Sequence, residues 1–416
     1  MTEYDVIVVG AGPAGSSAAW RTASGGARVL LLDKAVFPRD KPCGDGLTPR
    51  ALRSLRAIGL AEEADRLHRI DRFRIFGGGR MLEFDWPGSE GFPDHACVVP
   101  RTILDTMLLR HAEAAGAETR LEAEITAPLV EEGRVVGVRV RARTDGYPVR
   151  APVVIAADGA SSRIGRALGM TPRDDRPLGV AIRAQAAANR ADEQVMEMHA
   201  ELLDGKALLP GYGWVFPMGG GRVNVGVGVA STYERWRALN MASLMDVFLR
   251  SLPREWRLPD LKELQRSGDL KGWRLPMGCA VWPPWRPGLL LVGDAAGVIN
   301  PFNGEGISEG IESGLRAAET ALLALGSGGP DDLSEYQRRL EELFGPYYRL
   351  ARANLRMLSR PKVARTVTRV AMRTPPLMRF GVNLRGSLYY REHGRSVAHR
   401  TARGLLWAAS RMRSTG

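Results

Sequence analysis

The chain has 416 residues, of which 44% are hydrophobic and 25% charged. These are ordinary values for globular proteins and exclude a largely disordered chain. No stretch approaches about 18 uninterrupted apolar residues, so we expect no membrane-spanning helix. The three cysteines, Cys43, Cys97 and Cys279, are too scattered for a disulfide framework or a metal cluster. We therefore predict a reducing cytoplasmic setting and no bound metal.

Positive charge is concentrated at the C-terminal end. Residues 351–416 hold 15 Lys and Arg residues and one acid, Glu392, whereas residues 1–350 hold 43 basic and 45 acidic residues. Apolar and aromatic residues are interspersed at helical spacing in the basic segment. This combination favours peripheral attachment to an anionic membrane surface, at the cytoplasmic face of the cell membrane. A solvated helical face and nucleic-acid binding are the competing interpretations, and we expect no nucleic-acid partner.

The predicted elements alternate between strands and helices. The first residues run straight into an apolar strand at 5–9, which argues against a signal peptide. We then expect helix 14–24, strand 27–32, a Gly/Pro-rich loop at 38–49, helix 101–115, strands 135–141, 153–157, 179–184, 213–216, 223–229 and 289–292, and helix 306–325. The remainder is expected to be helical and broken at Pro346, Pro361 and Pro375. This order predicts an α/β nucleotide-binding fold with a second, sheet-based domain.

A glycine-rich turn follows the first strand. Gly10, Gly12 and Gly15 have the GxGxxG spacing between a buried strand and a helix, where they permit a tight turn, close approach of a pyrophosphate and close helix–strand packing. The helix N-terminus then faces the phosphates. Asp33 ends the second strand and is expected to bind ribose hydroxyls, which favours FAD or NAD over NADP.

Later strand ends favour FAD over NAD, because a long cofactor needs polar groups from distant parts of the chain. Asp158-Gly159 and Gly293-Asp294 follow short apolar strands, and Asp294 is a candidate acceptor for a ribityl hydroxyl. Gly304 and Gly306 open the Ala-rich helix and offer backbone N–H groups. Arg101 begins a helix and is a candidate phosphate ligand. Each feature alone also fits an ordinary turn or surface position.

Together these motifs resemble the glutathione-reductase/p-hydroxybenzoate-hydroxylase-like FAD-binding fold. Two further motifs are similar to those of the geranylgeranyl reductase family of FAD-dependent oxidoreductases. Lys41-Pro42-Cys43-Gly44-Asp45-Gly46-Leu47 resembles its Cys-x-x-Gly loop, and Tyr212-Gly213-Trp214-Val215-Phe216-Pro217 matches its Tyr-x-Trp-x-Phe-Pro pattern. The resemblance covers about residues 4–325 and implies an enzyme that saturates an isoprene C=C of a membrane polyprenyl lipid, above all the menaquinone side chain.

The resemblance also implies a division of the chain and a set of site residues. The FAD-binding domain is expected at 1–60, 97–170 and 277–330, a β-rich substrate domain at 61–96 and 171–276, and a helical basic C-terminal region at 331–416. FAD contacts are expected from Ala14, Asp33, Cys43, Gly44, Gly46, Arg101, Ile125, Asp294, Gly306 and Ile307. With the glycines and strand ends above, Pro13, Lys34 and Asp45 complete the predicted FAD site.

Tyr212, Trp214 and Phe216 are expected to line the substrate tunnel. Their alternation places them on one face of a strand. An isoprene alkene is not polarised by a carbonyl, so its reduction needs a hydride, a proton and stabilisation of positive charge, which aromatic faces can provide. We predict Cys43, Tyr212 and Trp214 as catalytic residues. Cys43 is a candidate proton relay, gate or merely small residue, and the aromatic residues can alternatively be core.

Other functions stay open at this stage. A geranylgeranyl-lipid or geranylgeranyl diphosphate reductase fits the same motifs, and a flavin monooxygenase or halogenase shares the cofactor fold. A halogenase of this kind would show Trp-x-Trp-x-Ile-Pro, whereas Tyr212 and Phe216 stand at those positions. A non-catalytic flavin- or membrane-binding module is a third class. No separate nicotinamide domain is evident, so NAD(P)H, ferredoxin and a quinol remain candidate electron donors.

Overall fold

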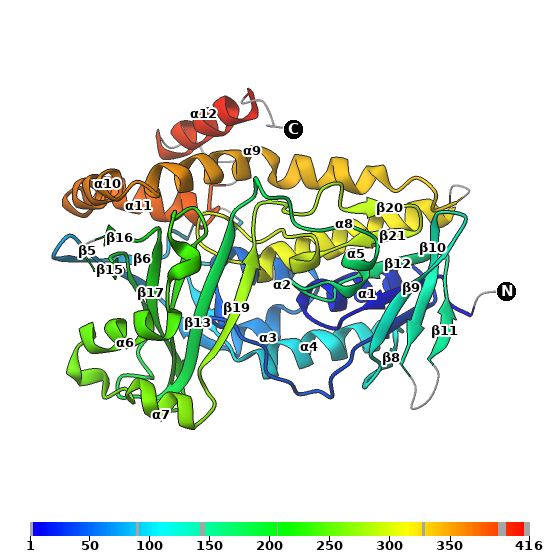
Figure 1. Ribbon diagram of the computed structural model, residues 1–416, viewed down its shortest axis with the longest axis horizontal. Helices are drawn as coiled ribbons and strands as arrows, with labels where there is room; N and C mark the ends of the chain where they lie inside the picture. Colours follow the sequence, from blue (N-terminus) through cyan, green and yellow to red (C-terminus); the bar gives the residue numbers. More distant parts are fainter. Residues whose placement is uncertain are drawn as a thin grey trace.

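The structure is a computed structural model that describes residues 3–88, 91–141, 146–205, 207–326, 329–389 and 397–411. Two large sheets lie side by side, and a long helix, α9 (Ser334–Leu358), extends over both (Figure 1). The shorter helices α10 (Pro361–Arg373) and α11 (Pro375–Arg385) follow at one end, and α12 (Val397–Arg411) packs on α9.

The first sheet has six strands and carries the glycine-rich turn. Its order is β20 (Trp285–Arg286), β21 (Leu289–Leu291), β12 (Val153–Ala156), β1 (Val6–Val9), β2 (Val29–Leu32) and β8 (Glu118–Arg120). All pairs are parallel except β20–β21. The four residues of β1 are fully buried, as are those of β12, because both faces of a parallel sheet are covered.

Helices and a small sheet provide that cover. One hydrophobic core joins the six-stranded sheet to α1 (Pro13–Ser24), α8 (Ile307–Gly326) and the three-stranded sheet β9 (Ile125–Glu131), β10 (Arg134–Val140) and β11 (Tyr147–Arg150). Helix α4 (Arg101–Ala114) packs on α1, and α5 (Arg163–Ala167) packs on β9. The predicted strand–helix alternation is thus confirmed, with ends shifted by one or two residues at most of these elements.

The second sheet has seven strands and forms a wall of the site. Its order is β19 (Lys271–Pro276), β13 (Leu178–Ala187), β18 (Arg222–Ala230), β17 (Gly211–Gly219), β14 (Val195–His199), β5 (Arg72–Gly77) and β6 (Arg80–Asp85). Only β14–β5 is a parallel pair. Helices α6 (Met241–Ser251) and α7 (Leu261–Arg266) cover one face, where valines at every second position of β18 are buried.

Shorter elements complete the fold. They are α2 (Pro49–Ala57), α3 (Ala61–Asp65), the three-stranded sheet β3 (Gly46–Leu47), β7 (Ala96–Val98) and β4 (His68–Ile70), the pair β15 (Leu203–Asp204) and β16 (Ala207–Leu208), and 3-10 turns at Trp236–Ala238, Arg254–Trp256 and Gly293–Ala295. Helix α2 begins at Pro49, with the Thr48 side chain accepting a hydrogen bond from the Ala51 N–H. This cap fixes where the Cys43-containing loop ends.

The expected helix break at Pro346 is wrong. Pro346 lies inside α9, which continues to Leu358. A proline inside a helix removes one backbone hydrogen bond and costs about 3 kcal/mol. Here Phe344, Tyr347 and Tyr348 are buried next to it, and Tyr348 donates a hydrogen bond to the Val298 carbonyl. Burial of these large side chains offsets that cost.

The other two expected breaks are confirmed, because α10 begins at Pro361 and α11 at Pro375. Proline fits the first position of a helix, where its missing N–H would have no partner within the helix. Among the described helices, none combines the length and apolar composition that crossing a bilayer requires. Residues 390–396 and 412–416 of the basic segment, including Tyr390, lie outside the described residues.

Candidate active site

One large cavity lies between the two sheets and the C-terminal helices. It has a volume of about 710 Å³ and extends from the glycine-rich turn, along β17, to α10 and α11. Most of the predicted site residues line it: Gly12, Pro13, Ala14, Cys43, Gly44, Asp45, Gly46, Arg101, Asp294, Gly304, Gly306, Ile307, Tyr212, Trp214 and Phe216. Segments that are far apart in the sequence therefore meet around one space.

The glycine-rich turn is shaped by close backbone contacts. Gly10 has a φ of +100°, and a Cβ there would lie 2.4 Å from the Ala157 carbonyl oxygen. A Cβ at Gly15 would lie 1.8 Å from the Gly10 carbonyl oxygen. Gly12 is the N-cap of α1 and offers no side-chain cap, so the first N–H groups of the helix stay available to a ligand.

Cations surround this helix start. A Cβ at Gly12 would lie 3.7 Å from Nη2 of Arg39 and 3.9 Å from Nη2 of Arg101. Arg101 is buried and held by two 2.7 Å hydrogen bonds to Asp105, which also pairs with Arg39 at 2.9 Å. Two fixed guanidinium groups beside open helix N–H groups fit the pyrophosphate of a dinucleotide. Arg39 was missed from the sequence, because nothing in its loop marks it.

Six predicted cofactor residues do not line the cavity: Gly10, Gly15, Asp33, Lys34, Ile125 and Asp158. The two glycines shape the turn, Ile125 is core and Lys34 is exposed. Asp33 accepts hydrogen bonds from the backbone N–H groups of Ala11 and Ala35, at 2.7 and 2.9 Å, so its carboxylate holds the glycine-rich turn. Asp158 accepts from the N–H groups of Arg163 and Ile164 and thereby supports the start of α5.

The loop that carries Cys43 is fixed to the second sheet. Arg183, which is almost fully buried in β13, donates to the Cys43 carbonyl at 3.2 Å and to Asp40 at 2.8 Å. Asn224 of β18 donates to the same carbonyl and to the Asp45 carboxylate, each at 2.8 Å. Neither Arg183 nor Asn224 belongs to a sequence motif, so both were missed.

Burial changes the protonation of two groups in this loop. It raises the pKa of the Cys43 thiol, so the thiol stays protonated at neutral pH. It also raises the pKa of Asp45 from 3.8 to about 6, although Asn224 and Gln185 donate hydrogen bonds to that carboxyl. The loop thus presents a neutral thiol to the cavity.

The three predicted aromatic residues form a strip along one wall. Alternation along β17 turns Tyr212, Trp214 and Phe216 toward the cavity, while Gly213 faces Phe248 of α6. The ring centroids of Tyr212 and Trp214 are 5.9 Å apart, and those of Trp214 and Phe216 are 6.2 Å apart. The predicted single face is confirmed.

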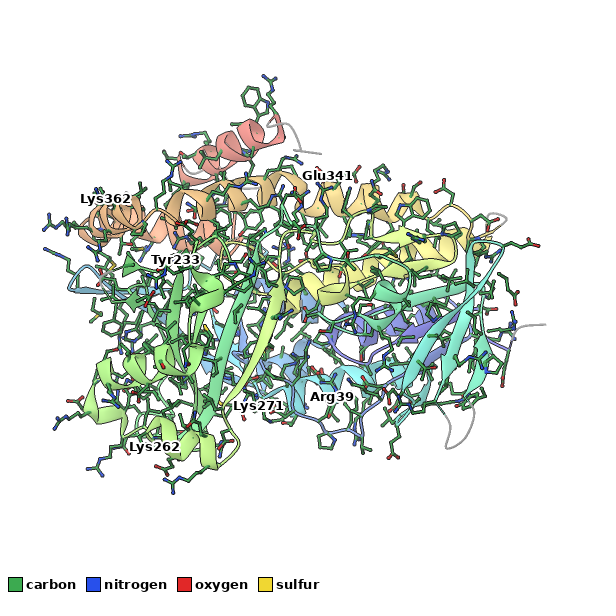
Figure 2. The ribbon with its side chains drawn as sticks, in the orientation of Figure 1. Arg39, Tyr233, Lys262, Lys271, Glu341 and Lys362 are labelled. Carbon is green, nitrogen blue, oxygen red and sulfur yellow. The ribbon has the colours of Figure 1, made fainter. Side chains whose placement is uncertain are left out.

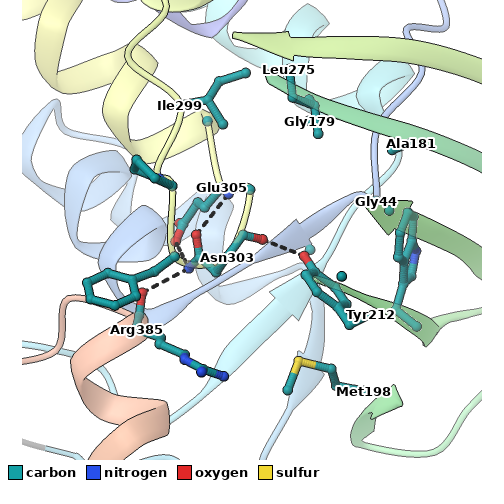
Figure 3. A pocket seen from close by; sticks show the side chains of 18 of the residues that line it. Gly44, Gly179, Ala181, Met198, Tyr212, Leu275, Ile299, Asn303, Glu305 and Arg385 are labelled. Atoms are coloured by element: carbon teal, nitrogen blue, oxygen red, sulfur yellow. Dashed lines mark hydrogen bonds between the residues drawn. The ribbon is translucent and has the colours of Figure 1, made fainter. Parts of the chain in front are cut away.

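Polar contacts hold two members of the strip in place. The Trp214 indole N–H donates to the Asn224 side-chain oxygen at 2.8 Å. The Tyr212 hydroxyl donates to the Asn303 carbonyl (Figure 3), and burial raises the pKa of Tyr212. Both rings are therefore fixed, and the phenol is neutral. Because Gly226 of β18 carries no side chain, the Trp214 ring can lie against that strand.

The start of α8 forms the opposite wall and carries buried acids. Glu305 accepts hydrogen bonds from Thr48 at 2.6 Å and Ser308 at 2.9 Å, and Ser308 also donates to Glu309 at 2.6 Å. Burial raises the pKa of Glu305, and raises that of Glu309 to about 8, against the opposing effect of Arg50. Asp294, the candidate ribityl acceptor, pairs here with Lys41 at 3.0 Å.

The far end of the cavity is made by the basic C-terminal region. Its apolar lining there includes Leu355, Leu358, Val367, Ala371, Leu377, Met378 and Val382. Several of these residues were expected at a membrane surface, and Met372 is buried against β5 and β6 instead. Figure 3 shows Asn303 between Tyr212 and the Arg385 backbone of α11, to which its amide donates. The C-terminal helices are thus part of the site.

Comparison with known proteins agrees with this geometry. A family model described as an FAD binding domain matches residues 3–343. The chain belongs to this family. It is an FAD-dependent oxidoreductase. The open helix N-terminus, the glycine-rich turn and the paired guanidinium groups are features that fit FAD.

Relatives with assigned activities are similar over most of the chain. A menaquinone reductase of Mycolicibacterium smegmatis is 40% identical over 93% of this chain and 92% of its own length. Digeranylgeranylglycerophospholipid reductase 1 of Methanopyrus kandleri is 34% identical over 86% and 91%. A crystal structure of a geranylgeranyl bacteriochlorophyll reductase-like protein from Thermoplasma acidophilum covers 98% of this chain and 95% of its own, with 25% identity and a TM-score of 0.74.

Proposed function

We propose that this enzyme saturates an isoprene C=C of a membrane polyprenyl lipid, with the menaquinone side chain as the first candidate substrate. The observation that carries the proposal is the continuity of the cavity, which joins the FAD-binding turn to a lining of aromatic and aliphatic side chains. Such a space suits a flexible hydrocarbon tail. The 40% identity to a menaquinone reductase supports the same substrate class.

We propose that FAD lies along the residues from Gly12 to Gly46 and from Asp294 to Ile307 that line the cavity. When bound and reduced, FAD supplies a hydride. Arg39 and Arg101 would bind its phosphates. Asp33 lies beside the same turn, where it holds the Ala11 N–H and is the candidate for the ribose hydroxyls.

The protein's own groups provide orientation, charge stabilisation and a proton. Tyr212 and Trp214, fixed by Asn303 and Asn224, present ring faces that stabilise positive charge developing on a substituted carbon. Cys43 holds a thiol proton in the same wall, because burial raises its pKa. The apolar lining from α10 and α11 excludes water.

Peripheral membrane contact is part of the proposal. Val397 and Trp407 of α12 are 69% and 58% exposed, and Arg411 stacks over the Trp407 ring at 3.8 Å. Figure 2 shows Lys362 of α10 at the edge of the molecule, at the end where α10 and α11 line the cavity. A cationic, partly apolar surface beside the cavity suits a lipid tail that enters from the cytoplasmic face of a bilayer.

Lipid mass spectrometry tests the proposal. The chain is expressed in a host that makes unsaturated menaquinone, and quinones are compared with those of cells carrying an empty vector. The expected result is menaquinone with two additional hydrogens. Archaeal-type geranylgeranyl ether lipids are supplied in the same assay. If these lipids gained two hydrogens instead, the result would favour the substrate class of the Methanopyrus relative. Product formation with stoichiometric oxygen uptake would identify a monooxygenase.

A further inference from the structure

A second, smaller hollow shares the lining residue Leu355 with the cavity. It has a volume of about 140 Å³ and is lined by Asp174, Asp175, Arg176, Pro177, Ser231, Thr232, Arg352, Leu355 and Arg356. These residues come from the segment before β13, the two residues after β18 and the C-terminal turns of α9. We call it the arginine hollow. No predicted FAD or substrate residue lines it.

Several hydrogen-bond donors in the arginine hollow lack an acceptor. The Arg176 side chain is only 10% exposed, and its Nε and Nη1 atoms are buried without a hydrogen-bond partner. The Thr232 hydroxyl is also buried without a partner. Arg352 uses Nη1 to donate to the Gly278 carbonyl at 3.2 Å. Buried donors without acceptors cost free energy, and an anionic ligand would supply acceptors.

The charges around the hollow are predominantly positive. Arg352 lies within α9, and burial, followed by the neighbouring Arg176, lowers its pKa to about 10. Arg356 and Arg349 lower the same pKa further. The acids are at the rim: Asp174 is exposed, and Asp175 is held by Arg173 through hydrogen bonds of 2.9 and 3.1 Å.

Asp175 is also the nearest acid to Arg176, at 3.5 Å from Nη1, and this contact does not form a hydrogen bond. Arg352 and Arg356 have no ion pair with an acid among the described residues. Arg352 is thus repelled by Arg176, Arg356 and Arg349, while Arg176 is attracted by Asp175 at the rim, and an anion in the hollow would relieve the repulsion felt by Arg352.

From this arrangement we propose that the arginine hollow is a binding site for a phosphate group. Two guanidinium groups and a hydroxyl that converge from three chain segments suit a tetrahedral oxyanion with several acceptor oxygens. The hollow is about one fifth of the cavity in volume, which suits an inorganic phosphate or a headgroup rather than a nucleotide. Leu355 lines both spaces, so a phosphate bound here would lie one side chain from the apolar cavity.

Calorimetric titration of the FAD-loaded enzyme with inorganic phosphate tests the site. FAD is kept bound so that its own phosphate site is filled, and ionic strength is held constant with chloride. Arg176→Gln and Arg352→Gln are each expected to weaken saturable phosphate binding by about tenfold or more, as is typical for loss of a charge-assisted hydrogen bond. Arg352→Lys should retain part of the affinity.

Arg338→Gln is the matched control, because Arg338 is an exposed arginine of the same helix that pairs with Glu335 and Glu342 outside the hollow. It should bind phosphate as the unmodified enzyme does. Thr232→Val removes the hydroxyl at nearly constant shape and should weaken binding even if an arginine variant fails to fold. Absence of saturable phosphate binding, or equal binding by Arg176→Gln and Arg338→Gln, would overturn the proposal.

A second titration distinguishes two sources of the phosphate. A short-chain phosphatidylglycerol, kept below its micelle concentration, is compared with diacylglycerol of the same chain length. Tighter binding of the phospholipid than of inorganic phosphate, sensitive to Arg176→Gln, would support a lipid headgroup. Binding of inorganic phosphate alone would support a free phosphate in the same site. Neither result depends on which alkene the enzyme reduces.

Discussion

At the residue scale, the structure limits the chemical roles that Cys43 can have. Its thiol is protonated and lies in the cavity wall. If that proton is used in the reaction, Cys43→Ala should lower kcat by about 100-fold or more, as loss of a general acid does. FAD content, measured by absorbance, should not change. Equal turnover of Cys43→Ala and the unmodified enzyme would show that only the small size of the residue matters.

Asp45 should make the FAD-free protein less stable as pH rises. Its pKa is about 6 in the folded protein and near the ordinary value of 3.8 in the unfolded chain. The folded state therefore binds more protons between about pH 4 and 6, and stability falls as pH rises through this window. The difference corresponds to about 3 kcal/mol above pH 6.

Asp45→Asn tests this linkage, because asparagine tolerates the φ of +61° at this position. The variant should be more stable than the unmodified protein at pH 8, by up to about 3 kcal/mol, with the gap closing toward pH 4. Urea unfolding at a series of pH values measures it, and Asp85→Asn, at an exposed position, is the control. If the difference in stability between the variant and the unmodified protein did not change with pH, the Asp45 carboxyl would not titrate as described.

Residue-scale prediction from sequence succeeded where a motif ties side chains to one local geometry. The Cys43–Gly46 loop and the three aromatic residues of β17 meet at the cavity as predicted. Asp33 and Asp158 were expected at the cofactor; both accept hydrogen bonds from backbone N–H groups, neither lines the cavity, and their contact with FAD stays a prediction. Arg39, Arg183 and Asn224 were missed because their contacts depend on chain segments distant in sequence, which spacing does not reveal.

At the element scale, β18 provides the clearest test of how the aromatic strip is held. A Cβ at Gly226 would lie 2.4 Å from the Trp214 ring and 2.6 Å from the Ile182 carbonyl oxygen. Gly226→Ala should therefore displace Trp214 and destabilise the protein by about 1–3 kcal/mol, as overpacking does. Unfolding in urea and tryptophan fluorescence measure both effects.

Gly228→Ala is the matched control two residues further along the same strand, since its nearest atoms would be 3.7 Å away. It should leave stability and fluorescence almost unchanged. If the two substitutions had equal effects, the packing of Trp214 on β18 would be wrong as described.

Element prediction itself worked best for the buried strands, and it failed at Pro346, where tertiary burial offsets an unfavourable local residue.

At the scale of the whole molecule, the C-terminal region lines the cavity and also carries the surface proposed to contact a membrane. Its helices α10 and α11 close the cavity, so deletion of 351–416 would open the site as well as remove charge. Sequence composition revealed the charge of this region but not which apolar residues face inward, because that depends on how α9 places the helices. The domain boundaries expected from the sequence stay a prediction.

Substitutions on α12 separate the two roles. Leu405→Ser with Trp407→Ser should weaken binding to anionic vesicles by about tenfold or more, because each exposed apolar side chain contributes about 1.5–3 kcal/mol when buried. Sedimentation with phosphatidylglycerol vesicles measures this, and FAD content should not change. Val130→Ser, at an exposed position of β9, is the control. Undiminished vesicle binding by the double variant would exclude α12 as a membrane contact.

The central claim is that FAD chemistry and a polyprenyl tail meet in one cavity of this enzyme. A single turnover without oxygen tests it most directly. Enzyme with photoreduced FAD is mixed anaerobically with menaquinol, whose ring is already reduced and cannot take the flavin's electrons, flavin absorbance is followed, and the lipid is analysed by mass spectrometry. The account predicts one menaquinol with two additional hydrogens in its side chain for each flavin reoxidised. Flavin that stays reduced, or that reoxidises while every side-chain alkene survives, would contradict it.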